Sequence, residues 1–531
     1  MPASSVRDAT FDVMRRFGMT TIFGNPGSTE ITFLTDLPSD IEFVLGLHEG
    51  AVVGIATGYA IARGEPSFVN LHTAPGLGNA INAIANARDC SAPLVIVVGQ
   101  QDRRQLAYEP FLTGRRLEQL AGDYPVWTNL PVRAQDVPGS IARAYHEAVA
   151  GAGPALVVVP MGDWLEPMDE LGAGAPVLAR RPRAVGGDDV LPFADLIADA
   201  ESPALVVGMG AGSPEAWDAV TSLAERLRSP VFQEAFSRRA GFPQDHELFT
   251  GPLPWRRRQM REALAPHDLV IALGTSAFRM YILEEPEPFV AAETKLAVIT
   301  EDSAEAHRSP CDVALVAPVA EACRTLVTMV PARDRPPPPA RPRPPTPDPP
   351  RPGEPLRPAH VFAALAERLP ADVVLIEETP SSQPELYERI PARAPLGLVA
   401  GGNGGLGFGV AGTIGLRMGL PSRPVVAVVG DGSALYSIQA VWSAAQYGIG
   451  ALLVVMGNGR YAVMDGLARA RGAAGPWPAF DGIDVAGIAR SFGCPAVKVQ
   501  AHDELTAILD EVVPGLSDRR EPLVLDVTVD R

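Results

Sequence analysis

Short runs of apolar, mostly β-branched residues recur along the chain, and stretches rich in alanine and leucine separate them. Such runs are typical of parallel strands buried on both faces, and the stretches between them suit the connecting helices. The expected strands are 20–24, 68–72, 93–99, 154–160, 204–210, 269–274, 296–300, 373–378, 425–432, 451–459 and 522–529. The pattern predicts an α/β fold built from doubly wound parallel sheets.

A proline-rich segment divides the chain. Residues 331–355, PARDRPPPPARPRPPTPDPPRPGEP, cannot form helix or sheet, because proline lacks the amide donor and restrains its predecessor. We expect a polyproline II linker; a ligand for an SH3-like module is the minor alternative. Together with the grouping of the strands, this segment predicts three domains, at 1–180, 181–330 and 356–531.

Charge and targeting signals exclude several classes of function. The net charge of −17 and the pI near 5.0 argue against a nucleic-acid or anionic-membrane partner. No stretch reaches 18 apolar residues, the N-terminus lacks an apolar signal region, and the four cysteines lack metal-binding spacing. We therefore expect a soluble, cytoplasmic protein with reduced thiols.

Two expected strand ends in the third domain carry hard oxygen ligands. Asp431 stands between Gly430 and Gly432, and Asn458 follows the next strand, 27 residues further on. Ligands bind beyond the carboxyl ends of strands in such sheets. With diphosphate oxygens and a backbone carbonyl, for which Arg460 is the candidate, these residues predict an octahedral Mg²⁺ site.

Gly402, Gly404 and Gly407 match the G-x-G-x-x-G dinucleotide fingerprint. Asp431 lies well beyond the spacing of about 20 residues expected for its acidic partner, and it has its own glycine turn. We therefore interpret these glycines as structural, serving close packing of helix on strand.

Glu49 precedes thirteen residues, 50–62, that carry no charged side chain. Small and apolar side chains on that run allow another layer to approach closely, so Glu49 is expected to be desolvated. Burying a carboxylate is costly, or raises its pKa, unless something compensates. An isolated glutamate here would ordinarily be a helix cap or an ion-pair partner.

Six motifs resemble those of a known family. They are FGNPGST (23–29), LHEGAVVGIATGYA (47–60), FVNLHTAPGLGNA (68–80), GGLGFGVAGTIG (404–415), GDGSALYSIQAVWSAAQYG (430–448) and MGNGRYAVM (456–464). They are similar to motifs of the thiamine-diphosphate-dependent 2-oxoacid decarboxylases and carboligases, and most of all to the benzoylformate decarboxylases. The similarity runs nearly end to end but is weaker in the middle domain, and the linker is peculiar to this chain.

The resemblance implies a pyrimidine-binding first domain, a middle domain and a third domain that binds the diphosphate and Mg²⁺. Glu49 would hydrogen-bond N1′ of the cofactor's aminopyrimidine and exchange a proton with it. In the family, Glu49 and Asp431 of one site come from different subunits. A homodimer is therefore the smallest active unit, and a homotetramer is usual. FAD binding by the middle domain stays open.

The resemblance also assigns further residues to the site. Ser28 and His72 match positions that contact the substrate carboxylate and move protons, and Leu406 matches the residue that bends the cofactor. The other matches are diphosphate and cofactor contacts at Ser381, Gly432, Ser433 and Tyr461, and apolar pocket positions at Val463, Met464 and Leu467. Two positions depart from the benzoylformate pattern: Ala400 replaces a phenylalanine, and Tyr281 replaces a second catalytic histidine.

These observations predict a thiamine-diphosphate- and Mg²⁺-dependent carboxy-lyase. It would decarboxylate an aromatic or bulky 2-oxo acid to the aldehyde without oxidation, and Tyr281 would act with Glu49, Ser28 and His72. The alternative is a carboligase or lyase that forms or cleaves 2-hydroxy ketones with the same cofactor. A regulatory protein that kept the fold without catalysis is a third hypothesis, disfavoured by the intact Glu49, Asp431 and Asn458.

Overall fold

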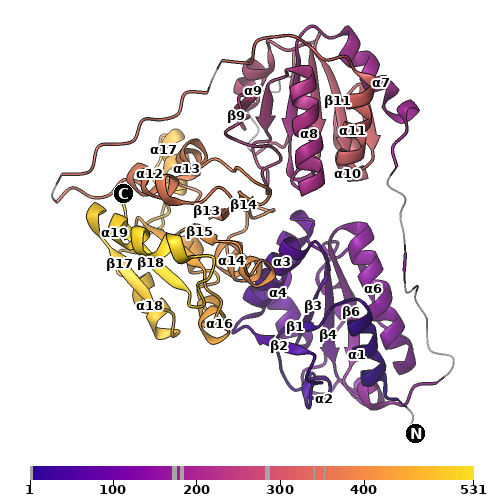
Figure 1. Cartoon of the computed structure of the whole chain (residues 1–531). Helices are drawn as coiled ribbons and strands as arrows, with labels where there is room; N and C mark the ends of the chain where they lie inside the picture. Colours follow the sequence, from indigo (N-terminus) through magenta and orange to yellow (C-terminus); the bar gives the residue numbers. More distant parts are fainter. Residues whose placement is uncertain are drawn as a thin grey trace.

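The computed structural model describes residues 4–169, 176, 178–179, 184–281, 288–339, 341–351 and 353–530. They form three six-stranded sheets, and all pairs between the named strands are parallel. Figure 1 shows one sheet in each of three lobes, with helices packed against them. The predicted α/β fold with three parallel-sheet domains is confirmed.

The first sheet has the strand order β2-β1-β3-β4-β6-β5. Its strands are β1 (Thr21–Asn25), β2 (Glu42–Leu45), β3 (Ser67–Leu71), β4 (Leu94–Gln100), β5 (Trp127–Asn129) and β6 (Pro154–Pro160). The longer helices around it are α1 (Val6–Arg16), α3 (Glu49–Arg63), α4 (Thr73–Asp89) and α6 (Val137–Gly151).

The middle sheet has the order β12-β11-β10-β7-β8-β9. Its strands are β7 (Pro203–Val207), β8 (Val231–Gln233), β9 (Phe249–Pro252), β10 (Leu269–Leu273), β11 (Lys295–Thr300) and β12 (Val313–Val316). Its longer helices are α7 (Gly187–Asp199), α8 (Pro214–Leu227), α9 (Arg257–Leu264) and α11 (Val319–Met329).

The third sheet has the order β14-β13-β15-β16-β18-β17. Its strands are β13 (Val374–Glu378), β14 (Val399–Ala400), β15 (Val425–Gly430), β16 (Leu452–Gly457), β17 (Ala496–Val499) and β18 (Leu523–Thr528). Its principal helices are α12 (Pro358–Arg368), α14 (Phe408–Gly419), α16 (Ala440–Gln446), α17 (Ala462–Ala470), α18 (Val485–Ser491) and α19 (His502–Val512).

Every apolar run that was expected to be a strand overlaps one. The strands that the pattern did not reveal, such as β5 and β14, are short, and all of them lie at or next to a sheet edge. An edge strand is only partly covered, so it needs no continuous apolar run.

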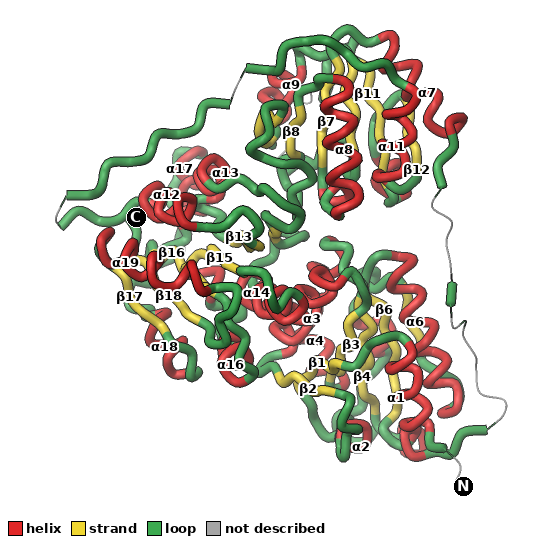
Figure 2. The backbone as a smooth tube through the Cα atoms, in the orientation of Figure 1, coloured by secondary structure: helices red, strands yellow, loops and turns green. Residues whose placement is uncertain are grey.

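The proline-rich segment carries no helix or strand in its described residues, 331–339, 341–351 and 353–355. Figure 2 shows it as a long loop from the middle domain to the third. The Arg389 guanidinium donates to the Pro345 carbonyl (3.0 Å), and the Asp348 carbonyl lies 3.1 Å from His360 Nε2. The predicted boundary at 180/181 lies outside the described residues, and the exact limits of the domains stay a prediction.

Helices α3 and α14 join the first sheet to the third, and they lie between these two sheets in Figure 1. One apolar core runs through both domains and includes Val69 of the first and Val429 of the third. The helix backbones approach closely: a Cβ on Gly415 would lie 1.8 Å from the Ile55 carbonyl oxygen, and one on Gly58 would lie 2.1 Å from that of Gly412. The small side chains after Glu49 thus permit this contact.

The segment after β8 connects the middle domain to the other two. The Arg239 guanidinium donates to the Cys90 carbonyl of the first domain (2.8 Å), and the Ala400 amide of the third domain donates to the Arg238 carbonyl (2.8 Å). Among the described residues, no helix has the length and apolar character needed to cross a membrane.

Candidate active site

The order of strands in each sheet reverses at one point, where a crevice forms beyond the carboxyl ends of two neighbouring strands. In the first sheet this point lies between β1 and β3, which end at Asn25 and Leu71. In the third sheet it lies between β13 and β15, which end at Glu378 and Gly430. The motifs GNPGST and HTAPG follow the first pair of strands, and EETPSS and GDGS occupy the second.

Glu49 is the first residue of α3 and is buried. Asn25, at the end of β1, donates from its side-chain amide to Oε1 (3.2 Å), and Asn79, in α4, donates to Oε2 (3.0 Å). His48 caps the helix, with Nδ1 accepting the Gly50 amide proton (3.0 Å). Both oxygens of the buried carboxylate thus have hydrogen-bond donors, which offset the cost of its burial.

His72 lies next to Glu49. A Cβ on Gly76 would lie 3.4 Å from Cβ of His72 and 3.5 Å from Oε1 of Glu49, so one glycine separates the two side chains. Thr73, which begins α4, is buried with φ of 28°, a conformation that a β-branched residue rarely adopts. Backbone strain of this kind collects at functional sites. Ser28 is exposed in the turn after β1.

Asp431 begins the short helix that follows β15 and is buried. Its Oδ1 accepts the Gly432 amide proton (2.8 Å), and its Oδ2 accepts that of Gly459 (2.7 Å), so the turns after β15 and β16 meet at this carboxylate. Burial raises the pKa of Asp431 above its ordinary value, although these hydrogen bonds lower it.

Asn458 lies in the turn after β16, where its Oδ1 accepts the Arg460 amide proton (3.0 Å). The ring of Tyr461 packs against Gly432, where a Cβ would lie 3.2 Å from a ring carbon. Ser433 is buried beside Asp431. The third-domain residues predicted to bind the metal and the diphosphate therefore lie at the ends of adjacent strands, and Ser381, after β13, is exposed.

The residues around Asp431 fit a divalent cation with a diphosphate. A carboxylate and an amide oxygen at adjacent strand ends are the hard donors that Mg²⁺ prefers. A cation there would also favour the charged form of Asp431, which burial disfavours. Backbone amides and small residues at Gly432 and Ser433 leave room for phosphate oxygens.

Leu406 lies where the third domain meets the first. Its carbonyl accepts a proton from the Asn82 side chain of α4 (3.3 Å). The following residues are held by Glu378, at the end of β13, whose carboxylate accepts the amide protons of Gly407 (2.5 Å) and Gly409. Burial raises the pKa of Glu378 to about 8.

The glycine motif lies at this junction between the first and third domains. Gly402 packs on the end of α4, where a Cβ would lie 2.5 Å from that of Asp89, and Gly404 and Gly407 have positive φ. The expectation that these glycines pack a helix on a strand was wrong. Gly409 of α14 has that role, because a Cβ on it would lie 2.6 Å from the side chain of Val429 in β15.

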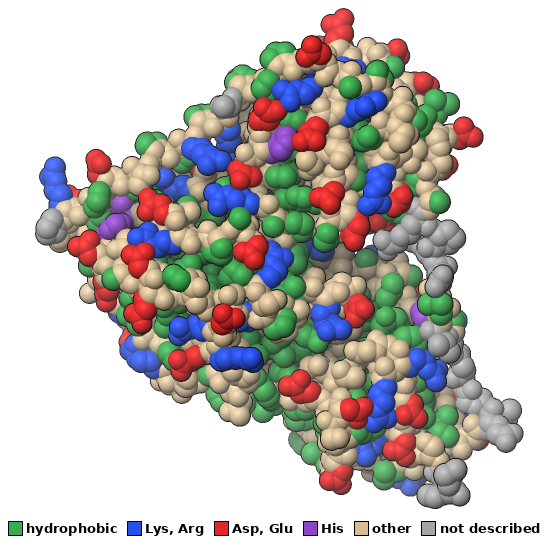
Figure 3. All heavy atoms as spheres, viewed as in Figure 1, with side chains coloured by type: hydrophobic (Ala, Val, Ile, Leu, Met, Phe, Trp, Pro, Cys, Tyr) green, Lys and Arg blue, Asp and Glu red, His purple; other side chains and the backbone are tan. Residues whose placement is uncertain are grey.

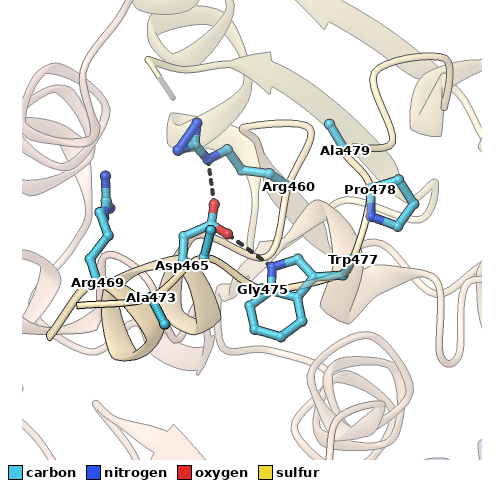
Figure 4. Close-up of a pocket in the computed structure, with 9 residues that line it drawn as sticks. Arg460, Asp465, Arg469, Ala473, Gly475, Trp477, Pro478 and Ala479 are labelled. Carbon is cyan, nitrogen blue, oxygen red and sulfur yellow. Dashed lines mark hydrogen bonds and ion pairs between the residues drawn. The ribbon is translucent and has the colours of Figure 1, made fainter. Parts of the chain in front are cut away.

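Helix α17 carries Val463, Met464 and Leu467 and has no buried residue. Figure 4 shows what holds its other face: Asp465 pairs with the Arg460 guanidinium (2.9 Å) and accepts the indole proton of Trp477 (2.9 Å). These residues line a cavity of about 290 Å³. The predicted apolar pocket residues thus lie on a surface helix, and Asp465 connects this helix to Arg460 and Trp477.

Tyr281 lies in the middle domain and Ala400 in the third. Tyr281 is 62% exposed and packs near the rings of Phe236 and Trp255. Ala400 is buried at the junction of the three domains. Among the described residues, no hydrogen bond or ion pair joins the Glu49 cluster to the Asp431 cluster, or Tyr281 to either.

Three polar residues in the site have no counterpart among the residues predicted from the sequence. Asn25 and Asn79 complete the hydrogen bonds of Glu49, and Glu30 contacts His72. Glu30 directly follows GNPGST, so its position next to this motif could have identified it as a site residue. The distance in sequence from Asn79 to Glu49 left no local pattern to detect.

The chain matches known families along most of its length. Residues 4–120, 191–326 and 382–527 match the models for the N-terminal TPP binding domain, the central domain and the C-terminal TPP binding domain of thiamine pyrophosphate enzymes. Thiamine pyrophosphate is another name for thiamine diphosphate.

Individual relatives agree with these matches. A benzoylformate decarboxylase from Pseudomonas aeruginosa is 36% identical, and the alignment covers 98% of each chain. The solved structure of a thiamine diphosphate-dependent 4-hydroxybenzoylformate decarboxylase from Rhodococcus jostii RHA1 has a TM-score of 0.92 at 32% identity, covering 99% of both chains. An acetolactate synthase large subunit from Parasynechococcus marenigrum is 27% identical over 96% of this chain and 86% of its own.

This chain belongs to the thiamine-diphosphate-dependent 2-oxoacid decarboxylase and carboligase family. It is an enzyme, and the carboxy-lyase class predicted for it is that of its benzoylformate decarboxylase relative.

Proposed function

We propose that this enzyme decarboxylates an aromatic or bulky 2-oxo acid without oxidation, releasing CO₂ and an aldehyde. The observation that carries the proposal is the pairing of buried Glu49 with His72 across Gly76. Similarity to a benzoylformate decarboxylase over 98% of the chain supports the same reaction class.

Residues of two domains would hold the cofactor. Mg²⁺ would be bound by Asp431, Asn458 and the Arg460 carbonyl. The diphosphate would be contacted by Gly432, Ser433 and Ser381, and the rest of the cofactor by Leu406 and Tyr461. Bound thiamine diphosphate supplies an electron sink for breaking the bond between the 2-oxo carbon and the carboxylate. Glu49 would hold and exchange a proton at the pyrimidine nitrogen, for which its place in a desolvated pocket between two amides is suited.

Ser28 and His72 would orient the substrate carboxylate, and His72 would move a proton at the reacting carbon. Val463, Met464 and Leu467 offer apolar side chains for a bulky substituent, and Ala400 leaves more room than a phenylalanine would. An aromatic substrate therefore suits the pocket.

Measuring CO₂ release from benzoylformate and a panel of other 2-oxo acids, with thiamine diphosphate and Mg²⁺ present, tests the proposal. Glu49→Gln should keep the fold and cofactor binding and lose roughly 10²- to 10⁴-fold in kcat, the usual worth of acid–base catalysis. Near wild-type turnover in this variant would refute the role of Glu49. No CO₂ from any 2-oxo acid would refute the decarboxylase.

Tyr281 favours a second candidate, a carboligase that joins the decarboxylated fragment to an aldehyde. A phenol is a much weaker acid than an imidazolium, so proton delivery to the decarboxylated carbon should be slower than with histidine. The similarity to an acetolactate synthase also supports this alternative.

Comparing wild type with Tyr281→His at a fixed aldehyde concentration tests this candidate. The ratio of 2-hydroxy ketone to free aldehyde should be higher in the wild type. If histidine leaves the ratio unchanged or raises the ketone share, Tyr281 does not deliver the proton.

A further inference from the structure

We propose that Glu30 is a positioning residue that fixes the orientation and tautomer of His72. The proposal rests on the role of His72 in the proposed function. Glu30 follows the turn after β1, and only 1% of it is exposed. It directly follows the motif GNPGST, which extends beyond the carboxyl end of β1.

Each oxygen of the Glu30 carboxylate has a partner. Oε2 accepts the Gly27 amide proton (2.8 Å) and lies 2.9 Å from Nδ1 of His72. Oε1 accepts the hydroxyl proton of Thr29 (2.5 Å), and the Thr29 oxygen also lies 2.9 Å from Nδ1 of His72. Two oxygens therefore converge on one nitrogen of the imidazole.

This arrangement determines which nitrogen carries the proton. The Thr29 hydroxyl has one hydrogen, which it donates to Glu30, so it can only accept from His72. An ionised Glu30 also only accepts. Nδ1 must therefore be the donor, and Nε2 is left as the nitrogen that exchanges a proton with a ligand.

Packing holds the ring as well. A Cβ on Gly27 would lie 2.4 Å from both Cγ and Nδ1 of His72, so the ring rests directly on the backbone of the turn. The imidazole is fixed by two oxygens at its edge and by the turn at its face. A side chain that moves a proton at a defined carbon needs this kind of support.

Glu30→Gln tests the proposal because a glutamine amide can donate to Nδ1 and so permits the wrong tautomer. We expect kcat for the best 2-oxo acid to fall roughly 10- to 100-fold, with a smaller change in KM. The decisive measurement is a double-mutant cycle with His72→Ala. If Glu30 acts through His72, Glu30→Gln should change kcat less than about twofold in the His72→Ala background.

Glu305→Gln is the matched control, because Glu305 is a buried glutamate of the middle domain that accepts a hydroxyl proton from Thr300 (2.8 Å). It should leave kcat near that of the wild type. Thr29→Val gives a second test if Glu30→Gln does not fold: its loss of kcat should also vanish in the His72→Ala background.

The outcomes separate the two proposals. Wild-type turnover in His72→Ala would show that the proposed function assigns His72 wrongly. A slow His72→Ala with equal losses from Glu30→Gln in both backgrounds would overturn the positioning role alone and leave the proposed function standing.

Discussion

Glu49 and Asp431 are buried carboxylates at the carboxyl ends of parallel strands, and amide groups donate to both. Their partners differ in kind. Glu49 accepts from two side chains, whereas Asp431 accepts from the backbone of two strand turns. The first arrangement would suit a carboxylate that exchanges a proton, and the second would suit one that binds a cation together with the amide oxygen of Asn458.

Asp431→Ala should abolish Mg²⁺-dependent retention of thiamine diphosphate, because a bound dication would no longer offset the charge of the diphosphate. Titration calorimetry with and without Mg²⁺ measures the effect. Equal cofactor affinity of the wild type in both conditions would refute the metal site.

A second prediction at this scale concerns Glu234, after β8. Burial raises the pKa of Glu234 to about 7 from an ordinary 4.5. Between these two pH values the folded chain therefore keeps a proton on Glu234 that the unfolded chain loses. The contribution of Glu234 to the free energy of unfolding is fully present below pH 4.5 and is lost as the pH rises through about 7. The loss amounts to roughly 3 kcal/mol.

The melting temperature of the wild type should accordingly fall from pH 5 to pH 8. The melting temperature of Glu234→Gln should fall less, because the glutamine amide does not titrate. Glu42→Gln, at an exposed site, is the control and should follow the wild type. An equal fall in Glu234→Gln and wild type would contradict the prediction.

Among the elements, α3 and α14 each begin beside residues of the candidate site. Helix α3 begins at Glu49, and α14 follows the loop that carries Leu406. The two helices meet through Gly58, Gly412 and Gly415, with backbone atoms in place of side chains at the contact. Such a contact cannot adapt by changing a rotamer, so an added methyl must move a helix.

Gly415→Ala should therefore lower the free energy of unfolding by about 1–3 kcal/mol or more, although alanine favours helix. Gly466→Ala is the matched control in α17, where a Cβ meets nothing within 4 Å, and it should be neutral or stabilising. Thermal unfolding of both variants measures the difference. Equal stability of Gly415→Ala and wild type would show that the helices separate without cost.

On the scale of the whole molecule, the clusters around Glu49 and Asp431 lie in different domains. Figure 3 shows hydrophobic side chains gathered on the face where α3, α14 and α16 meet. Leu47, just before α3, and Tyr436, beside Gly407 at the start of α14, are large exposed apolar residues. We propose that a second copy of the chain covers this face, and that Glu49 of one copy and Asp431 of the other form one site.

Co-expression of Glu49→Gln and Asp431→Ala chains tests this arrangement. Each variant alone should be nearly inactive. A mixed dimer would contain one site with both residues intact, so random pairing should restore about a quarter of wild-type activity. No recovery in mixed dimers, verified by two affinity tags, would show that each site forms within one chain.

The sequence predicts most of the longer strands, and it predicts Asp431 and Asn458 at strand ends, because each of these is a local feature. A continuous β-branched run indicates a strand buried on both faces, and Asp431 and Asn458 directly follow such runs. Short edge strands such as β14 escape this reasoning, since two residues carry no period.

Contacts between distant segments were decided only by the tertiary structure. Nothing near Glu49 indicates that Asn25 and Asn79 donate to it, or that α3 packs on α14 more than 350 residues away. Glu30 and His72 are 42 residues apart, and each alone resembles an ordinary turn residue. They meet because β1 and β3 are adjacent at the point where the strand order reverses, and that adjacency is a property of the whole sheet.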